Sequence, residues 1–200
     1  MHFLKNARRA AGVTVAVVLC FAGTAWGKEP TETAASRESC VHPLIEQPFT
    51  TFGDMRDYVL APGGSFDDPS APGWDLDGGA AVSDGALDLP VGASATTPAM
   101  CVDLNYPTMR FLGLQKTKRD ADIDVEVLYP DAEDHALEWH KAGSAQVKRA
   151  DEWEPTPDVK LSPERGGKFA GGRPVALRFT NDSRKSNWRI DNVYVDPRRR

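Results

Sequence analysis

Apolar and polar side chains alternate along two stretches of this chain. Large apolar residues occupy every second position, at 123, 125, 127 and 129 of the stretch 122–129 and at 175, 177 and 179 of the stretch 175–180. Successive side chains of a strand point to opposite faces, so a period of two puts the apolar side chains on one face. We therefore predict two half-buried strands whose apolar faces share one core.

Shorter apolar runs recur between residues that favour turns. Gly78-Gly79 and Asp84-Gly85 mark two turns, and the second dipeptide is a strong hairpin signal. About ten short strands separated by such turns predict an all-β domain, built as two packed antiparallel sheets. The remaining strands are predicted at residues 47–52, 57–61, 74–76, 80–82, 86–89, 94–102, 108–114, 136–140, 159–161 and 188–195.

The first 27 residues have the layout of a secretory signal peptide. Three basic residues precede an almost wholly apolar run at residues 11–22, and Ala25-Trp26-Gly27 provides the small residues of a cleavage site. We predict cleavage after Gly27 and a secreted, extracellular protein. The apolar run is shorter than the ~20 residues of a bilayer span, so we expect no membrane span after cleavage. The alternative is an uncleaved membrane anchor.

The mature chain is expected to hold one domain. Residues 28–39 are polar and lack any periodicity, which predicts a disordered leader. Residues 40–197 form the predicted β-sandwich, and residues 198–200 form a basic tail. One such domain is large enough to bury a hydrophobic core.

Removal of the signal peptide makes the chain more acidic. The whole chain has 24 Lys and Arg against 29 Asp and Glu. The signal peptide holds three of the bases and no acid, which leaves 24 − 3 = 21 bases and a formal net charge of 21 − 29 = −8. Since such a chain repels phosphate backbones, we expect no nucleic-acid partner.

Two cysteines remain after cleavage, because Cys20 leaves with the signal peptide. In an oxidising compartment Cys40 and Cys101 most simply form one disulfide. In the chain-entropy model, closing a loop of that length stabilises the fold by about 4 kcal/mol. The alternative is two free thiols, one of them available for pairing between chains.

Motifs at both ends of the predicted domain carry a family resemblance. Gly64-Ser65-Phe66-Asp67 with Gly73-Trp74 near the start, and residues 188–196 at the end, resemble jelly-roll carbohydrate-binding modules and related galactose-binding-like domains. The resemblance implies a two-sheet antiparallel jelly roll in which the first and last strands are adjacent.

The mature chain is also similar to a group of secreted bacterial proteins with no assigned activity. The shared pattern lies at residues 58–66, 95–102, 107–111 and 190–197, so it spans nearly all of residues 40–197. This similarity predicts the fold of the chain but implies no activity for it.

The resemblance further implies a structural Ca²⁺ site. Acidic residues on the adjacent first and last strands hold calcium in carbohydrate-binding modules, and Asp67 and Asp191 stand at the matching positions. Calcium takes six to eight oxygens from carboxylates and backbone carbonyls. This chain has Asn192 where the family pattern has a second aspartate, which reduces the negative charge. The alternative is that Asp191 only hydrogen-bonds backbone where the two strands meet.

Sugar binding requires aromatic side chains with polar groups around them. Trp74 and Trp188 belong to the fold motifs and are expected in the core, whereas Trp139 and Trp153 lie near charged segments and are candidates for stacking on a sugar. Polar residues that the alternation places on an outward face are Arg110, Asp122, Asp124, Glu126, Glu138, His140 and Arg178. That face could bind a hydroxyl-rich ligand, or could be a solvated, salt-bridged surface.

One pattern suggests an enzyme. Asp122, Asp124 and Glu126 alternate as the catalytic carboxylates of jelly-roll glucanases do. Retaining hydrolysis requires carboxyls about 5–5.5 Å apart, whereas positions four apart on a strand are separated by about 13 Å. The leading hypothesis is therefore a non-catalytic extracellular module that binds a polysaccharide. The alternatives are a structural or interaction protein of the cell envelope, and a glycan hydrolase.

Overall fold

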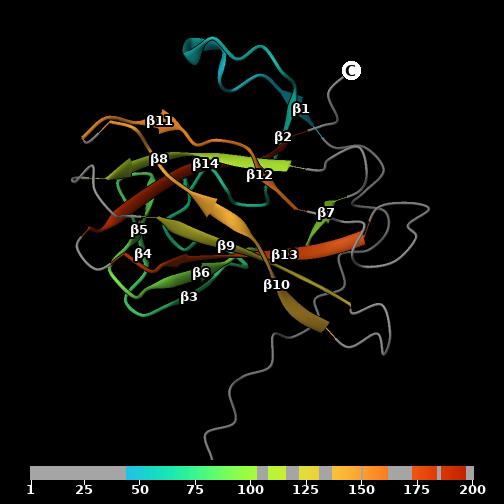
Figure 1. Ribbon diagram of the computed structural model, residues 1–200, viewed down its shortest axis with the longest axis vertical. Coiled ribbons are helices and arrows are strands. Elements are labelled where there is room, and N and C mark those ends of the chain that lie inside the picture. Colours follow the sequence, from blue (N-terminus) through green and yellow to red (C-terminus); the bar gives the residue numbers. More distant parts are fainter. Residues whose placement is uncertain are drawn as a thin grey trace, which may run out of the picture. The chain divides into compact units, whose positions relative to one another are not determined.

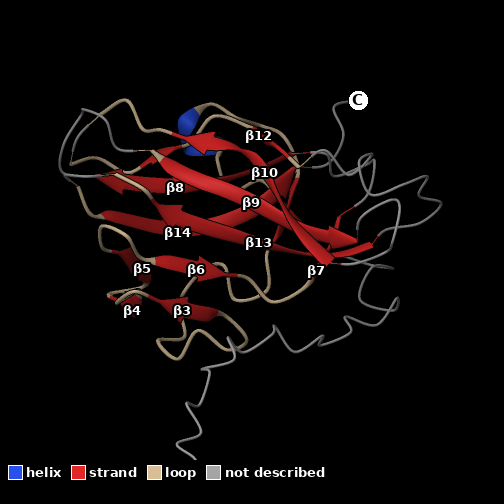
Figure 2. Ribbon diagram, turned by 60° about the horizontal axis from the view of Figure 1, so that its bottom comes forward, coloured by secondary structure: helices blue, strands red, loops and turns tan. Residues whose placement is uncertain are grey.

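Two antiparallel β-sheets make up the fold in the computed structural model (Figures 1 and 2). The structure describes residues 44–102, 108–115, 122–130, 137–149, 151–161, 173–183 and 186–196. The predicted all-β, two-sheet class is confirmed. The predicted signal peptide, leader and basic tail lie outside the described residues, as do Cys40 and the side chain of Cys101, so the disulfide stays a prediction.

The first sheet is centred on the last strand, β14 (Trp188–Asp196). On one side β14 pairs with β8 (Thr108–Gln115), and on the other with β2 (Tyr58–Leu60) and β5 (Ala86–Leu89). The sheet is completed by β1 (Ile45–Glu46) beside β2, β4 (Ala81–Ser83) beside β5, and β11 (Glu154–Pro155) and β12 (Val159–Lys160) beside β8. The first described strands and the last one are thus neighbours, as the resemblance implied.

The second sheet is centred on β13 (Arg173–Asn181). On one side lie β9 (Ile123–Pro130) and then β10 (Leu137–Ala145); on the other lie β6 (Ser94–Thr96) and β7 (Met100–Val102), with β3 (Asp75–Asp77) beyond β6. Consecutive strands repeatedly change sheet, as between β8 and β9 and between β13 and β14, which is typical of a jelly roll.

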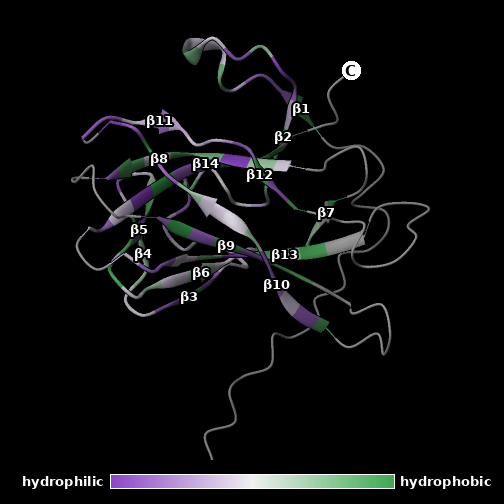
Figure 3. Ribbon diagram, viewed as in Figure 1, coloured by the Kyte–Doolittle hydropathy of each residue, from purple (hydrophilic) through white to green (hydrophobic). Residues whose placement is uncertain are grey.

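The core lies between the sheets and follows the predicted alternation. Val125, Leu177 and Phe179 are 0% exposed, while their neighbours along the strands are partly exposed. Figure 3 shows the same alternation of hydrophobic and hydrophilic residues along the long strands. Trp74 and Trp188 are buried in this core, as predicted. Each large apolar side chain buried here stabilises the fold by about 1.5–3 kcal/mol.

The Asp84-Gly85 hairpin is confirmed. Asp84 and Gly85 have φ angles of 48° and 68° between the paired strands β4 and β5. Two positive φ angles at the centre of a two-residue loop define a type I′ turn, whose twist matches that of the strands.

Two strand predictions need correction. The strand predicted at residues 47–52 is wrong, because the chain forms the 3-10 helix η2 (Thr50–Phe52) there. Phe49, just before η2, is buried against Tyr58 and Tyr194 on the outer side of the first sheet. The strand predicted at residues 94–102 is two strands, β6 and β7, separated at Pro98, which has no N–H for a ladder hydrogen bond.

Candidate functional site

Two rows of polar side chains cross the outer face of the second sheet. Paired residues on neighbouring strands point to the same side, so the strand register defines each row. One row runs Lys141, Glu126, Arg178, Thr96 and Asp75, and the next runs Ser144, Asp124, Thr180, Ser94 and Asp77. We call these ten residues the polar face.

Trp139 borders the polar face. It lies opposite Leu128, two positions along β9 from Glu126. The guanidinium carbon of Arg178 lies 4.2 Å from the centre of the Trp139 ring, which is a cation–π contact. Glu126 holds that guanidinium, since its carboxylate accepts hydrogen bonds from Nε and Nη2 of Arg178, each at 2.7 Å. Arg178, Glu126 and Trp139, all predicted from the sequence, are thus brought together.

A second ion pair lies beside this group. Lys141 Nζ donates to Asp124 Oδ2 at 2.9 Å, and this hydrogen bond raises the pKa of Lys141. Asp122, just before β9, accepts a hydrogen bond from Gln146 Nε2 at 2.5 Å. The three alternating acids of the hydrolase hypothesis therefore each bind a different partner, and nothing described here pairs two of them as reacting carboxyls.

Arg110 does not belong to this face, which corrects the grouping predicted from alternation. It lies on β8 in the first sheet, whereas Arg178 and the acids lie in the second, because β8 and β9 belong to opposite layers. His140 is also placed differently, since it lies opposite Val127, whose side chain is buried. The register of β10 turns Trp139 outward and His140 toward the core.

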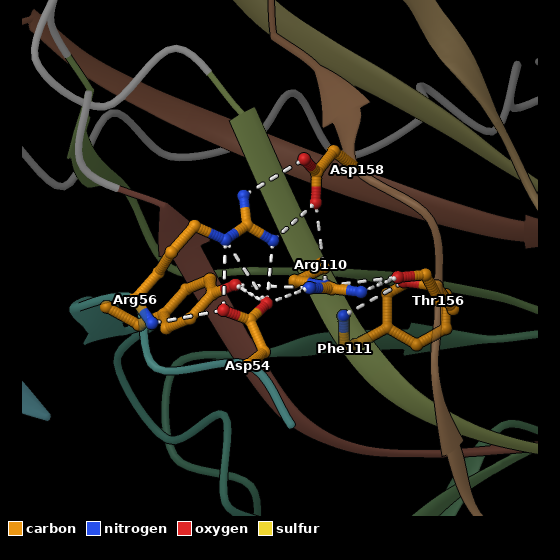
Figure 4. Close-up of polar contacts among 7 residues, drawn as sticks. Asp54, Arg56, Arg110, Phe111, Thr156 and Asp158 are labelled. Carbon is orange, nitrogen blue, oxygen red and sulfur yellow. Dashed lines mark hydrogen bonds and ion pairs between the residues drawn. The ribbon is translucent and has the colours of Figure 1, made fainter. Parts of the chain in front are cut away.

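Arg110 instead belongs to a network on the outer side of the first sheet (Figure 4). Its Nη1 forms an ion pair with Asp54, and its Nε and Nη2 donate to the backbone carbonyl of Thr156 at 3.0 and 2.7 Å. Asp54 also accepts from Arg56 Nη2 at 2.7 Å and from the Tyr58 hydroxyl at 2.6 Å. These hydrogen bonds, that of Arg56 above all, hold the pKa of Asp54 well below its ordinary value.

This network joins three separate parts of the chain. Arg56 Nη1 contacts Asp158 at 3.1 Å, and the Phe111 backbone N–H donates to Thr156 Oγ1 at 3.2 Å. Segment 54–58, strand β8 and segment 156–158 are thereby fixed to one another. The guanidinium groups of this network are paired with the carboxylates of Asp54 and Asp158. We therefore interpret the network as one that stabilises the fold.

Trp153 belongs to a segment of the first sheet, whereas Trp139 lies on β10 of the second. Trp153 directly precedes β11, which pairs with β8 in the first sheet, and it is partly buried. The structure therefore does not combine the two predicted tryptophans into one binding surface.

Asp67 and Asp191 lie near a β-bulge in β14. The register shifts between Asp191 and Tyr194, and Asn192 has a φ angle of 52°. Asp191 accepts hydrogen bonds from the Asn192 backbone N–H at 2.6 Å and from its Nδ2 at 3.0 Å, while Asp67 accepts from Ser65 Oγ at 2.7 Å. Burial raises the pKa of Asp191 to about 6, and the negative charge of Asp67 adds to this effect.

These two carboxylates could supply part of a cation site. Among the described residues neither forms an ion pair with Lys or Arg, and no group of three or more His, Cys, Asp or Glu gathers. Calcium bound here would therefore take most of its oxygens from backbone carbonyls, the Asn192 amide and water. Oxygen ligands of this kind suit a hard cation, although only two of them would be carboxylates.

Sequence reasoning missed all of the hydroxyl groups and two of the acids on the polar face. Ser94, Thr96 and Thr180 join the face only through the strand register. For Asp75 and Asp77 a signal existed, since they alternate with Leu76, whose side chain packs against the core. The strand predicted at residues 74–76 ends before Asp77, and the alternation assigned no outward face to it.

Comparison with known proteins yields matches among solved structures alone. No protein-family model matches this chain, and no curated protein matches it either. The similar solved structures include a family two carbohydrate esterase from Cellvibrio japonicus, with 12% identity and a TM-score of 0.41 over 70% of this chain. The match covers 33% of that esterase chain, so this chain corresponds to about a third of its length.

Two further similar structures are single carbohydrate-binding modules. A non-crystalline cellulose specific module, CBM28, shows 11% identity and a TM-score of 0.46 over 68% of this chain and 94% of its own. A CBM4 module shows 18% identity and a TM-score of 0.42 over 66% of this chain and 98% of its own. The similar solved structures thus include carbohydrate-binding modules, and the function of this chain has to be argued from the site.

Within the described part of the chain, no helix has the length and apolar character needed to cross a membrane.

Proposed function

We propose that the polar face and Trp139 bind a polysaccharide, and that the protein is a non-catalytic extracellular binding module. The observation that carries this proposal is the group Trp139–Arg178–Glu126, in which a partly exposed aromatic ring is fixed beside a charged donor. An aromatic side chain contacts the apolar side of a sugar ring, and the surrounding donors and acceptors bind its hydroxyls.

The hydroxyl-bearing residues of the polar face support the same proposal. Ser94, Thr96 and Thr180 are partly exposed and lie next to Arg178 or to one another across the strands. Such groups both donate and accept hydrogen bonds, which suits the hydroxyls of a sugar. Because the face lies on paired strands, its groups are held in place before a ligand arrives.

A second candidate function has its own support. In the ion pairs Arg178–Glu126 and Lys141–Asp124, four charged groups of the face are paired with one another, as expected of a solvated sheet surface. This favours a structural or interaction protein of the cell envelope without a small ligand. The two candidates differ in whether any glycan binds.

Substitution of Trp139 tests the proposed function. We expect the Trp139→Ala variant of the mature protein to lose tenfold or more in affinity, about 1.4 kcal/mol or more, because an aromatic anchor is removed from the contact. Affinity electrophoresis and pull-down on insoluble polysaccharides measure this. Trp153→Ala is the matched control, since Trp153 is also partly buried but precedes a strand of the other sheet. Absence of glycan binding by the wild-type protein would favour the second candidate.

We also propose that Asp67 and Asp191 hold a structural Ca²⁺ at the β14 bulge. The support is the approach of two carboxylates at irregular backbone, neither of which forms an ion pair among the described residues. A divalent cation would compensate both charges and fix the segment around Asp67 to the last strand.

A further inference from the structure

Negative charge on the polar face is compensated at one end and not at the other. We infer that the glycan bound there carries amino groups, as a polymer of glucosamine does. This inference rests on the proposed function, and it adds the chemical class of the ligand.

The compensated end is formed by β9, β10 and β13. Glu126 is paired with Arg178 at 2.7 Å, and Asp124 is paired with Lys141 at 2.9 Å. Each acid there has one basic partner, so this end of the face is close to neutral.

The uncompensated end is the edge strand β3. Asp75 and Asp77 are exposed and lie opposite Thr96 and Ser94, which carry no charge. Within the described parts of the chain, neither carboxylate forms a side-chain hydrogen bond or an ion pair. The ten residues of the polar face include four acids and two bases, so its formal charge is 2 − 4 = −2.

A ligand lying across the strands contacts both ends. Neighbouring strands are ~4.8 Å apart, so β10 and β3, four steps apart in the sheet, are separated by roughly 19 Å. A polysaccharide that contacts Trp139 and runs across the sheet therefore passes Asp75 and Asp77. Its protonated amines are attracted there, whereas the carboxylates of a uronic-acid polymer are repelled and neutral sugars gain nothing.

The effect is expected to be moderate and sensitive to salt. Exposed ion pairs each contribute little and are screened within about 10 Å at 0.1 M ionic strength. Two such contacts correspond to a preference of roughly three- to tenfold for the amine-bearing glycan at low salt. At high salt the amine-bearing glycan and its neutral counterpart should bind with nearly equal affinity.

The experiment compares two oligosaccharides of equal length, one of glucosamine and one of N-acetylglucosamine, by titration calorimetry of the mature protein. A mildly acidic buffer keeps the amines protonated, and oligogalacturonate is the anionic probe. We expect the glucosamine oligomer to bind roughly three- to tenfold more tightly than its acetylated counterpart, and oligogalacturonate to bind most weakly.

Substitution on β3 tests the origin of the preference. The double variant Asp75→Asn with Asp77→Asn should lose the preference and keep its affinity for the acetylated oligomer. The matched control is Asp57→Asn with Asp68→Asn, two exposed acids outside the polar face, which should keep the preference. Equal binding of both oligomers, or a preference that survives the β3 substitutions, overturns the inference and leaves the proposed function standing. Failure of every glycan to bind overturns both.

Discussion

At the scale of single residues, Gly113 shows how tightly the core is filled on the inner side of the first sheet. A Cβ atom built on Gly113 would lie 2.7 Å from Trp188 Cζ3 and 2.9 Å from Val147 Cγ1. Both neighbours are buried, Trp188 completely, and an indole ring cannot turn aside as a flexible side chain can. The absence of a side chain at residue 113 is therefore a requirement of the core.

Gly113→Ala should lower the free energy of unfolding by about 1–3 kcal/mol, because an added methyl group in a filled core forces its neighbours to shift. Chemical denaturation measures this value. Gly143→Ala is the control, since its Cβ would meet only Val159 Cγ1 at 3.4 Å, an ordinary contact. Equal stability of the two variants would contradict the packing argument.

The charge of Asp54 contributes to stability at acidic pH. Hydrogen bonds, chiefly from Arg56, hold its pKa well below the ordinary value in the folded state. The unfolded chain therefore binds this proton at a higher pH than the folded protein does. The stability that Asp54 contributes is complete above its unfolded pKa of ~3.9 and is lost as the pH falls below it.

Asp54→Asn should cost about 2 kcal/mol at pH 7, because the neutral amide cannot compensate the guanidinium groups of Arg56 and Arg110. The difference from wild type should narrow as the pH falls from 4 toward 2. Denaturation at a series of pH values measures it. Asp57→Asn, an exposed neighbour, is the control and should change little. A gap between wild type and Asp54→Asn that is independent of pH would argue against a charge effect.

At the scale of elements, the β14 bulge explains the asparagine that departs from the family pattern. Asn192 adopts a φ angle of 52°, and asparagine accepts this left-handed conformation more readily than most residues. The bulge also lets the Val193 backbone N–H donate to the Gly64 carbonyl at 3.0 Å. The irregular strand thus joins the loop before Asp67 to the centre of the first sheet.

Calcium should stabilise the protein through this bulge. With Ca²⁺ at about 100 times its Kd, the free energy of unfolding should rise by about 2.7 kcal/mol, and a chelator should remove the gain. Thermal unfolding with Ca²⁺ and with EDTA measures the change. Asp191→Asn should abolish it, whereas Asp68→Asn, an exposed acid one residue after Asp67, should retain it. Identical melting of the wild-type protein under both conditions would rule out the calcium site.

Strands that bury one face could be predicted well from the sequence. The alternation at Val125 and Val127, and at Leu177 and Phe179, corresponds to β9 and β13 with the predicted side chains buried. Local signals failed for Phe49, because part of the apolar surface that it covers belongs to Tyr194, which is distant in sequence.

At the scale of the whole molecule, the sheet to which each strand belongs could not be predicted from the sequence. Arg110 and Arg178 show the same local alternation, yet one lies in each sheet. Which strands pair depends on contacts between residues far apart in the chain, and a shift of one position in β10 would exchange Trp139 and His140. For this reason Trp139, Arg178 and Glu126 could each be predicted as candidate binding residues, but their contact with one another could not.

The two outer surfaces of the sandwich differ in how much of the chain covers them. The first sheet carries Phe49, held over Tyr58 and Tyr194, and the Arg110 network around Asp54. Among the described residues, no comparable aromatic cluster covers the polar face of the second sheet. This asymmetry is why we place the binding surface on the second sheet.

The strands at the centres of both sheets, β13 and β14, are consecutive and come last in the described chain. Every other strand of each sheet pairs with one of them directly or through a neighbour. As the polypeptide emerges from a ribosome or a translocation channel, the earlier strands lack their central partners until residues 173–196 have appeared. Folding of this domain therefore waits until both central strands are available, and its speed is governed by closing chain loops more than a hundred residues long, such as the one between Tyr58 and Tyr194.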